Sequence, residues 1–368
     1  MKILVIEHFS AGNEYSLELC KNLAEHADIT LLTVDNSMLK EKVKYKCKKI
    51  LCGYGHPLLK RIAKYASGIW LTMLESIWGK YDIIHVQTFR MAYVEIILYM
   101  LVKLSGKKIV YTVHNVLPHE AKVMDKFFYS LMYNISDALV VHNEATADVL
   151  KREFKQALGK IAVIPHGAYD SYSKSGFEGR TADRYTVNLL QIGKIRDYKG
   201  ADILIKAAAV VPHEYRKRLN ITIAGKQEYD FDFDDLIKKE AVDDVVSIRN
   251  EFLPSEEIAR LFGNSDACIF PYREVYGSGA LLLSYTFGVP VIASDIPTFI
   301  EETDSGGAGL LFKSEDEHDL ADKIVEFMDM SESERNRFSR RIRNLVDTKY
   351  NWKNSAALTV RLYESIKN

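Results

Sequence analysis

Short apolar runs rich in Ile, Val and Leu alternate along most of the chain with segments whose apolar positions recur every three or four residues. The first pattern predicts strands buried on both faces, and the second predicts amphipathic helices. In the first half the predicted strands are 2–6, 28–34, 48–52, 82–86, 107–113, 137–141 and 161–164. The predicted helices are 14–26, 58–78, 92–104, 121–135 and 144–154. This alternation is typical of a parallel sheet covered by helices on both faces.

Residues 169–185 interrupt the alternation because they are polar, rich in Ser and Gly, and without periodicity. Such a composition indicates a linker. The alternation then resumes, with predicted strands at 187–192, 220–224, 245–248, 267–270, 290–293 and 309–312, and a helical tail from about residue 318. We therefore expect two doubly wound α/β domains. Their predicted bounds are 1–170 for the first domain, 171–186 for the linker, 187–345 for the second domain and 346–368 for a last helix that could cross back to the first domain.

The stretch 266–295 shows this pattern in its clearest form. A short apolar strand ends at Pro271, and Gly277, Ser278 and Gly279 then open a helix that runs to about Phe287. Gly288 follows where a left-handed cap is needed. A helix start formed by small residues exposes backbone N–H groups and partial positive charge, which suits a phosphate. Most crossovers of this kind are only scaffold, so the stretch by itself leaves both possibilities open.

The overall composition narrows the function classes. The chain has 368 residues and a net charge of −1, whereas a dedicated nucleic-acid binder is expected to be strongly basic. The four cysteines match no zinc or redox spacing and are expected to be reduced thiols of a cytoplasmic protein. No signal peptide and no apolar run long enough to cross a bilayer is expected from the sequence.

Ligands of open α/β sheets bind beyond the carboxyl ends of the strands. In the second half, the segment 193–200 follows a predicted strand, begins and ends with glycine, and precedes a predicted helix. Its cations Lys194, Arg196 and Lys199 could neutralise a pyrophosphate there. The alternative is a solvated loop with surface charges.

Ten histidines offer further candidates, although a lone histidine after a strand is more often a hydrogen-bonded structural residue than a catalyst. His114 is the best candidate because it follows a buried strand and precedes Asn-x-x-Pro. His8, His85 and His119 fit structural roles better. The spacing around His85 lacks the further ligands of a zinc site.

Five segments together resemble the nucleotide-sugar-dependent glycosyltransferases of the GT-B fold, in particular the large retaining family 4. They are TVHNVLP at 112–118, VIPHG at 163–167, IGKIRDYKGADILIKA at 192–207, PYREVYGSGALLLSYTFGVPVIASD at 271–295 and IEETDSGGAGLLF at 300–312. Each is weak alone, but their order and spacing match the family from Met1 to about Tyr363. The resemblance implies two Rossmann-like domains that face each other across a central cleft.

The resemblance also implies roles for residues that contact the donor diphosphate. Lys194 and Lys199 would hold the diphosphate, with Lys194 standing where the family usually has arginine. Gly12 lies in the loop that usually carries two adjacent glycines, one of which is alanine here. Ser278 and Gly279 would place backbone N–H groups against the phosphates.

Three further residues would lie at the donor sugar or in the same cleft. His114 would face the donor sugar, Glu274 would be the first carboxylate of the family's Glu-x7-Glu pair, and Glu301 would line the second domain. The second carboxylate of that pair falls on Leu283, or on Leu282 if Glu274 sets the alignment. This chain thus resembles the Tyr-Arg-x-x-x-x-Ser-Gly variant of the family, here residues 272–279, which lacks the glutamate that contacts the ribose.

The activity implied is retaining transfer of a hexose from a UDP- or GDP-sugar to a glycan or a lipid-linked saccharide, without a metal or other cofactor, in bacterial cell-surface polysaccharide synthesis. Two alternatives stay open: a sugar-nucleotide epimerase of similar fold, and a non-catalytic glycan-binding or partner subunit. A nicotinamide dehydrogenase fits less well, because neither half has G-x-G-x-x-G after its first strand.

A basic segment suggests a further partner. Residues 40–64 carry nine Lys or Arg and one acid, and an aromatic stretch follows up to residue 78. Basic and aromatic side chains together predict contact of 40–78 with an anionic membrane, on the inner face of the plasma membrane. The alternative is a solvated face with aromatics in the core.

Overall fold

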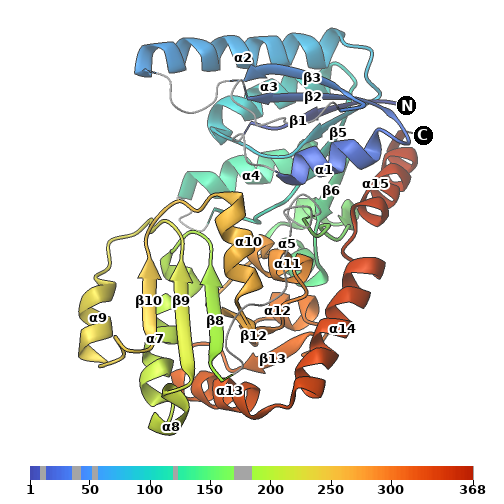
Figure 1. Ribbon diagram of the computed structural model, residues 1–368. Helices are drawn as coiled ribbons and strands as arrows, with labels where there is room; N and C mark the ends of the chain where they lie inside the picture. Colours follow the sequence, from blue (N-terminus) through green and yellow to red (C-terminus); the bar gives the residue numbers. More distant parts are fainter. Residues whose placement is uncertain (9–13, 35–42, 52–56, 119–122, 170–184, 368) are drawn as a thin grey trace. The chain divides into compact units, whose positions relative to one another are not determined.

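The computed structural model describes all residues except 9–13, 35–42, 52–56, 119–122, 170–184 and 368 (Figure 1). The chain divides into two compact units, which are treated one at a time. Unit 1 comprises Met1–Gly167 and Asn351–Asn368, and unit 2 comprises Ala168–Tyr350. Almost all of the predicted linker 171–186 lies outside the described residues.

Unit 1 contains a seven-stranded parallel sheet in the order β3-β2-β1-β4-β5-β6-β7. Its strands are β1 (Lys2–Ile6), β2 (Asp28–Val34), β3 (Lys46–Leu51), β4 (Ile83–Val86), β5 (Lys108–Thr112), β6 (Ala138–Val141) and β7 (Ile161–Val163). The runs of Ile, Val and Leu predicted as strands are buried almost completely in β1, β2 and β4–β6, because helices cover both faces of the sheet.

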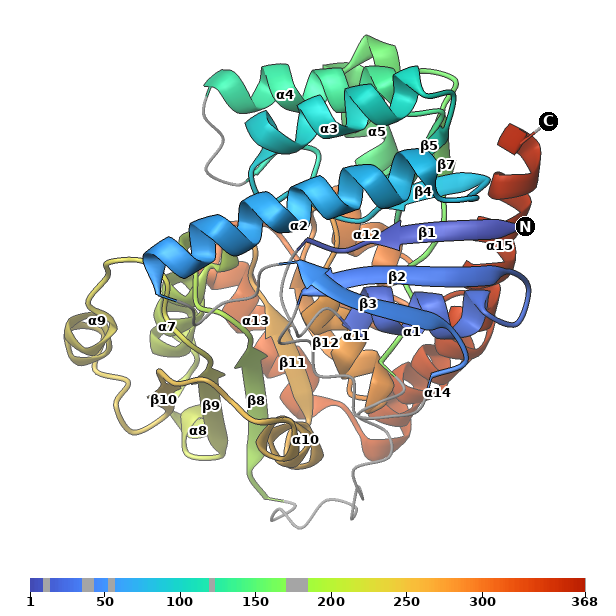
Figure 2. The same ribbon diagram turned by 90° about the horizontal axis from the view of Figure 1, so that it is seen from above.

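The helices of unit 1 are α1 (Glu14–Leu23), α2 (Leu58–Trp78), α3 (Ala92–Leu104), α4 (Val123–Ile135), α5 (Glu144–Glu153) and α15 (Trp352–Lys367), with a 3₁₀ turn at Lys155–Ala157. In Figure 2, α2, α3 and α4 lie on one side of the sheet, and α1 lies with α15 on the other. Trp352 and Tyr363 of α15 pack into the same core as Ile3 and Val5 of β1. The end of the chain is therefore part of unit 1.

Unit 2 contains a six-stranded parallel sheet in the order β10-β9-β8-β11-β12-β13. Its strands are β8 (Val187–Ile192), β9 (Leu219–Ala224), β10 (Val246–Arg249), β11 (Ala267–Phe270), β12 (Val291–Ser294) and β13 (Gly309–Phe312). The helices are α7 (Ala201–Val210), α8 (His213–Arg216), α9 (Phe233–Lys239), α10 (Ser255–Gly263), α11 (Gly279–Thr286), α12 (Pro297–Glu302), α13 (Glu317–Asp329) and α14 (Glu332–Thr348), with a 3₁₀ turn at Asp197–Lys199. One core joins α7, α9 and α13 to the sheet, and a second joins α10, α11 and α14 to it.

The prediction of two doubly wound parallel sheets is confirmed by the strand orders. Two differences concern helices. The helix predicted over 14–26 ends at Leu23, and the helical tail consists of three helices, α13, α14 and α15. Ser331 caps α14 through a reciprocal bond with Glu334, which is why a new helix begins there.

Candidate functional site

The carboxyl ends of β8 and β11 lie side by side where the strand order of unit 2 reverses. Leu189 of β8 is opposite Ala267 of β11, and the chain continues from β8 toward β9 on one side and from β11 toward β12 on the other. In open α/β sheets, ligands bind where adjacent loops diverge in this way. The candidate site is therefore built from two loops, 193–200 after β8 and 271–278 after β11.

Glycines allow the backbones around these loops to approach closely. Gly200 has a φ of +64°, and a Cβ atom there would lie 2.0 Å from the carbonyl oxygen of Pro271. Gly225 has a φ of +148°, and its Cβ would lie 2.0 Å from the carbonyl oxygen of Gly193. Larger residues at Gly200 or Gly225 would push the loops apart.

Arg273 joins the two loops. Its backbone N–H donates to the carbonyl oxygen of Tyr198 at 2.8 Å, and its guanidinium donates to the carbonyl oxygen of Asp197 at 2.5 Å. The guanidinium also pairs with Asp202 at 2.7 Å. Because these contacts are all internal to unit 2, Arg273 positions the loop 193–200 against the loop 271–278.

Lys199 brings a cation to the same place. Its Nζ lies 5.2 Å from the centroid of the Tyr272 ring, and a Cβ on Gly193 would come within 2.9 Å of it. Among the described residues no carboxylate forms an ion pair with Lys199. Burial lowers the pKa of Lys199. A partly desolvated ammonium without a carboxylate partner binds phosphate oxygens more strongly than a solvated one does.

Lys194 and Arg196, the other two predicted phosphate ligands, are paired with one carboxylate. Lys194 Nζ lies 2.6 Å from Glu228 Oε1, and Arg196 Nε donates to Glu228 Oε2 at 2.8 Å. The Lys194 side chain is 63% exposed, so this pairing is weak in energy and a diphosphate could displace it. The sequence therefore identified three cations of which only Lys199 lacks a carboxylate partner within the described chain.

The N-terminus of α11 adjoins Lys199 through Tyr272. Ser278 is the N-cap and accepts a hydrogen bond from the Leu281 N–H, as the sequence predicted for this helix start. A Cβ on Gly279 would lie 2.6 Å from the hydroxyl oxygen of Tyr169, so the first turn accommodates that hydroxyl only because residue 279 is glycine. Gly288 has a φ of +67° and follows the helix, as predicted.

Lys199 lies against the ring of Tyr272, and the hydroxyl of Tyr272 is buried near Ser278. The residue is only 1% exposed, and its hydroxyl has no hydrogen-bond partner of normal geometry in the part of the chain that the structure describes. The Ser278 side chain lies near it. Leaving a buried hydroxyl unpaired costs about 1–3 kcal/mol, which a bound oxygen-rich ligand would recover.

The two predicted carboxylates differ in their surroundings. Glu274 is exposed in the loop 271–278. Glu301 of α12 forms an ion pair with Lys349, with 3.7 Å between Glu301 Oε1 and Lys349 Nζ. Lys349 is the second-last residue of unit 2. Leu282 is buried and Leu283 is partly buried in α11, so neither position supplies a polar group.

In unit 1, His114 lies in a cluster of aromatic rings beyond the end of β5. Its ring is 4.9 Å from that of Tyr15 and 5.2 Å from that of His142. His142 follows β6 as His114 follows β5, so the topology brings the two rings together at neighbouring strand ends. Burial lowers the pKa of both histidines.

His85 and His8 are hydrogen-bonded within unit 1, as predicted for structural residues. His85 lies within β4, fully buried, with its Nδ1 2.5 Å from the Tyr363 hydroxyl and its Nε2 2.8 Å from Thr112 Oγ1. His8 is buried and lies 2.8 Å from the Tyr99 hydroxyl. Both are structural residues. His119 and Gly12 lie outside the described residues.

The strand order of unit 1 reverses between β1 and β4, and polar side chains gather there as well. Glu7 is 2% exposed and accepts hydrogen bonds from the hydroxyls of Ser16 at 2.7 Å and Thr88 at 2.6 Å. Gln87 is fully buried, and neither atom of its amide has a partner within the described ranges. An unpaired buried amide at a ligand-binding edge favours a polar ligand there.

Among the described residues, no group of three or more His, Cys, Asp or Glu side chains is placed to hold a metal ion. An Asp-x-Asp spacing does occur at Asp230, Asp232 and Asp234. Asp232 is the N-cap of α9 and accepts a hydrogen bond from the Asp235 N–H, so its local role is to begin that helix.

A second candidate surface lies on α2. Unlike an ordinary amphipathic helix, α2 buries small residues and exposes several large apolar ones. Its buried residues are Gly68, Thr72 and Ser76, which are small and spaced by four. A Cβ on Gly68 would lie 3.0 Å from the carbonyl oxygen of Ile50 in β3, so the small face lets the helix approach the strand closely. Six large apolar side chains of the helix are consequently exposed.

We define the apolar face of unit 1 as the exposed large apolar residues of α2, α3 and α4. These residues are Leu58, Leu59, Ile62, Trp70, Leu71, Trp78, Tyr93, Ile97, Met100, Leu101, Leu104, Val123, Met124 and Phe127. The three helices lie next to one another on the same side of the sheet (Figure 2). The alternative prediction that the aromatics after residue 64 belong to the core is wrong for Trp70 and Trp78, which are 58% and 69% exposed.

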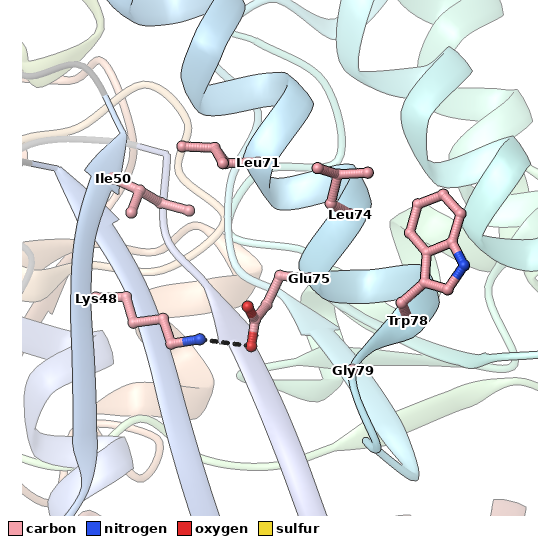
Figure 3. Close-up of a pocket in the computed structure, with 7 residues that line it drawn as sticks. All are labelled: Lys48, Ile50, Leu71, Leu74, Glu75, Trp78 and Gly79. Atoms are coloured by element: carbon pink, nitrogen blue, oxygen red, sulfur yellow. Dashed lines mark ion pairs between the residues drawn. The ribbon is translucent and has the colours of Figure 1, made fainter.

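A groove of about 470 Å³ runs beside this face, between β3 and the second half of α2 (Figure 3). Leu71, Leu74 and Ile50 form apolar walls, and Trp78 lies at one end. Inside it, Lys48 Nζ lies 2.7 Å from Glu75 Oε1. The ion pair neutralises the polar side of the groove, so the groove continues the apolar surface.

Sequence reasoning missed the contacts made by Arg273, Tyr272, Tyr169, Glu228 and His142. In the folded chain, four of them contact predicted site residues: Tyr272 contacts Lys199, Tyr169 contacts Gly279, Glu228 pairs with Lys194, and His142 contacts His114. The sequence pattern around most of these positions does not distinguish them from ordinary loop or strand residues. His142 could have been found, because it directly follows a predicted strand, as His114 does. Glu228 follows β9 by four residues and could have been found as an acid beyond the end of the strand that neighbours β8.

Two family models match the chain. Residues 12–171 match the family described as Glycosyltransferase Family 4, and residues 182–345 match Glycosyl transferases group 1. Among curated relatives, a D-inositol 3-phosphate glycosyltransferase of Paenarthrobacter aurescens is 26% identical over 61% of this chain and 56% of its own length. A GDP-mannose:glycolipid 4-beta-D-mannosyltransferase of Xanthomonas campestris is 24% identical over 68% of this chain and 72% of its own length. The chain thus spans only about half to three quarters of these relatives.

Solved structures agree in fold over nearly the whole chain. A glycosyltransferase from Rickettsia africae has a TM-score of 0.75 at 17% identity and covers 99% of this chain and 98% of its own. HepE of Anabaena in complex with UDP and glucose has a TM-score of 0.72 at 16% identity and covers 99% of this chain and 100% of its own. Both halves of the chain match glycosyltransferase family models, and its two Rossmann-like units have the fold of the GT-B glycosyltransferases.

Proposed function

We propose that this protein transfers a hexose from a nucleotide diphosphate sugar to a glycan or lipid-linked saccharide, with retention of the anomeric configuration. The observation that carries the proposal is the position of Lys199. Its ammonium has no carboxylate partner among the described residues and lies against Tyr272, next to the N-terminus of α11. A cation, a buried unpaired hydroxyl and a helix N-terminus together suit a diphosphate leaving group.

In this reaction the bond between the anomeric carbon and the diphosphate oxygen breaks, and the electron pair stays on the diphosphate. The acceptor hydroxyl forms the new bond on the same face of the sugar, and its proton passes to the leaving phosphate. Lys199 and the α11 N–H groups would stabilise the negative charge that develops, so no protein base and no metal is required for this step. Glu274 and Glu301 are proposed to contact the donor.

Relatives support the general chemistry. The Xanthomonas relative is named for GDP-mannose and a glycolipid, and HepE was solved with UDP and glucose. A Klebsiella pneumoniae protein encoded in a cps region is 22% identical over 72% of this chain. These names support a nucleotide-sugar donor and a role in surface polysaccharide synthesis in a bacterium.

The donor can be identified by thermal unfolding in the presence of UDP, GDP, ADP and dTDP and their sugars. We expect one nucleotide to raise the melting temperature. At a free nucleotide concentration of 100 Kd, binding adds about 2.7 kcal/mol to the free energy of unfolding. Consumption of the sugar nucleotide only when acceptor is present would separate a transferase from an epimerase. No response of the folded protein to any nucleotide would contradict the proposal and favour a non-catalytic subunit.

Stereochemistry needs its own measurement. NMR of the anomeric proton in the first-formed product is expected to show the configuration of the donor. An inverted product would reject the retaining mechanism while leaving the transferase assignment intact.

We further propose that the apolar face of unit 1 docks on an anionic membrane. Its large apolar side chains lie beside the exposed cations Lys60 and Arg61 of α2, and the only acid of that helix, Glu75, is paired with Lys48. Apolar side chains that can enter the acyl boundary, flanked by basic residues, are typical of helices that lie in the membrane surface. No described helix is both long and apolar enough to cross a membrane.

Vesicle flotation tests this surface. The protein is expected to float with phosphatidylglycerol vesicles at low salt and to bind phosphatidylcholine vesicles more weakly. Because a buried large side chain contributes about 1.5–3 kcal/mol, Trp70→Glu should lower the partition coefficient at least about tenfold.

Phe252→Glu serves as the matched control, since Phe252 is 83% exposed but lies in unit 2. Equal binding by wild type and Trp70→Glu would reject the proposed face. Self-association that Trp70→Glu abolishes, without any flotation, would show instead that the face binds a second copy of the chain.

A further inference from the structure

A chain of hydrogen bonds in unit 1 leads from a backbone carbonyl to His114. The Nδ1 of His142 lies 3.0 Å from the carbonyl oxygen of Ile164. The Nε2 of His142 lies 3.4 Å from the Nδ1 of His114. The hydrogen bonds therefore join three neighbouring strand ends. Ile164 directly follows β7, His142 directly follows β6, and His114 follows β5.

The direction of these bonds follows from their first member. A carbonyl oxygen can only accept, so Nδ1 of His142 carries a proton and donates to Ile164. Burial lowers the pKa of His142 to about 4, so at neutral pH its ring has one proton and its Nε2 has a lone pair. Nδ1 of His114 must then donate to that lone pair. Since burial also holds the pKa of His114 well below its usual range, the Nε2 of His114 is left unprotonated.

Packing keeps the rings in this arrangement. Tyr15 of α1 lies edge-on to His114 with the ring centroids 4.9 Å apart, and it also contacts His142 at 5.1 Å. Trp352 of α15 also packs against Tyr15, with the ring centroids 5.2 Å apart. A ring flip of either histidine would have to displace these aromatic neighbours. The chain of hydrogen bonds from Ile164 through His142 to His114, called the relay below, is therefore stabilised by packing as well.

The far end of this chain of hydrogen bonds is unpaired. The Nε2 of His114 is buried and has no hydrogen-bond partner within the part of the chain that the structure describes. We propose that His142 is a positioning residue that holds His114 in the tautomer protonated on Nδ1, so that His114 Nε2 accepts a hydrogen bond from a sugar hydroxyl of the substrate.

This inference rests on the proposed function for the identity of the ligand, but not for the tautomer. A lone pair on Nε2 can meet a hydroxyl, whereas it repels the oxygens of an ionised phosphate. His114 would therefore recognise the sugar and contribute nothing to binding of the free nucleoside diphosphate. The same ring in the other tautomer would donate and could select different groups.

The tautomer can be read by NMR on the full chain labelled with ¹⁵N-histidine. His114 is expected to show a protonated, pyrrole-type Nδ1 and a bare, pyridine-type Nε2 at neutral pH. The His142→Phe variant keeps a ring against Tyr15 but offers no acceptor, so His114 should shift toward the tautomer protonated on Nε2. The His142→Gln variant can accept through its amide oxygen and donate to Ile164 through its amide nitrogen, so it should restore the original tautomer.

Kinetics provide the second readout. We expect His142→Phe to lower kcat/KM for sugar transfer about 10- to 100-fold, the usual effect of losing a residue that orients a functional histidine. Binding of the free nucleoside diphosphate should stay unchanged, and His142→Gln should recover most of the lost activity. His318→Phe, at an exposed position of α13, controls for a His-to-Phe change as such.

A His114 that is protonated on Nε2 in the wild-type protein would overturn the proposal, whatever the activity. An unaltered tautomer and unaltered turnover in His142→Phe would overturn it as well. If the tautomer behaves as expected but no nucleotide sugar is turned over, the relay stands and the proposed function is the part that fails.

Discussion

Replacement of Lys199 by methionine is expected to lower the rate of sugar transfer about 10²- to 10³-fold, the loss seen when one preorganised group that stabilises developing negative charge is removed. The free energy of unfolding should change little, because the ammonium has no carboxylate partner within the described residues and methionine retains most of the apolar stem over Tyr272. The measurements are kcat with the identified donor and chemical unfolding.

Lys238→Met is the matched control, since Lys238 is exposed in the last turn of α9. If Lys199→Met retained wild-type turnover, the ammonium would have no part in stabilising the leaving group. A parallel loss of folding stability would show that Lys199 serves the structure of the loop 193–200.

Acidification from pH 6.5 to pH 5 is expected to destabilise unit 1 steeply. Burial lowers the pKa of His85 to about 3, of His142 to about 4 and of His166 to about 3, and holds that of His114 below its usual range. The unfolded chain binds these protons near pH 6.5, whereas the folded chain does not. Stability is therefore complete above pH 6.5 and is lost as pH falls toward the folded values, by up to about 1.4 kcal/mol per pH unit for each histidine.

Urea unfolding at a series of pH values, with proton uptake measured on unfolding, checks this expectation. The window above pH 5 separates histidines from carboxylates, whose ordinary pKa values lie near 4. A flat profile between pH 6.5 and pH 5 would mean that water reaches the buried rings and protonates them in the folded state.

Local signals predicted the elements of the candidate site accurately. The stretch around α11 shows why: Ser278 is the N-cap, Gly279 begins the helix and Gly288 takes the left-handed conformation after it. Each of these is a property of a few consecutive residues, and caps and positive φ values depend on local chemistry. The bounds of α2 and α3 were likewise predicted to the residue.

The roles of side chains within those elements were harder to predict. The sequence identified Lys194, Arg196 and Lys199 as equivalent cations, yet Glu228 pairs with the first two only. Arg273, read as part of a family segment, joins two loops separated by more than seventy residues in the chain. Ion pairs of this kind depend on which strand ends are neighbours, and the strand order is a tertiary property.

The helix α2 shows the same division. The recurrence of apolar residues determined that 58–78 is a helix, because a 3.6-residue period is a local pattern. It did not determine which face is buried. The small face of Gly68, Thr72 and Ser76 packs against the sheet, since a close approach to β3 requires small side chains, and six large apolar residues of the helix are left exposed.

The sequence by itself thus determined the alternation of strands and helices, the two-domain class, and the glycine-framed loop and helix start that form the candidate site. Tertiary structure alone decided which cation lacks a carboxylate partner, which face of α2 is exposed, and which nitrogen of His114 carries the proton. The physical reason is range: periodicity, caps and turns are set by neighbours in sequence, whereas pairing, burial and protonation are set by groups that only the folded sheet brings together.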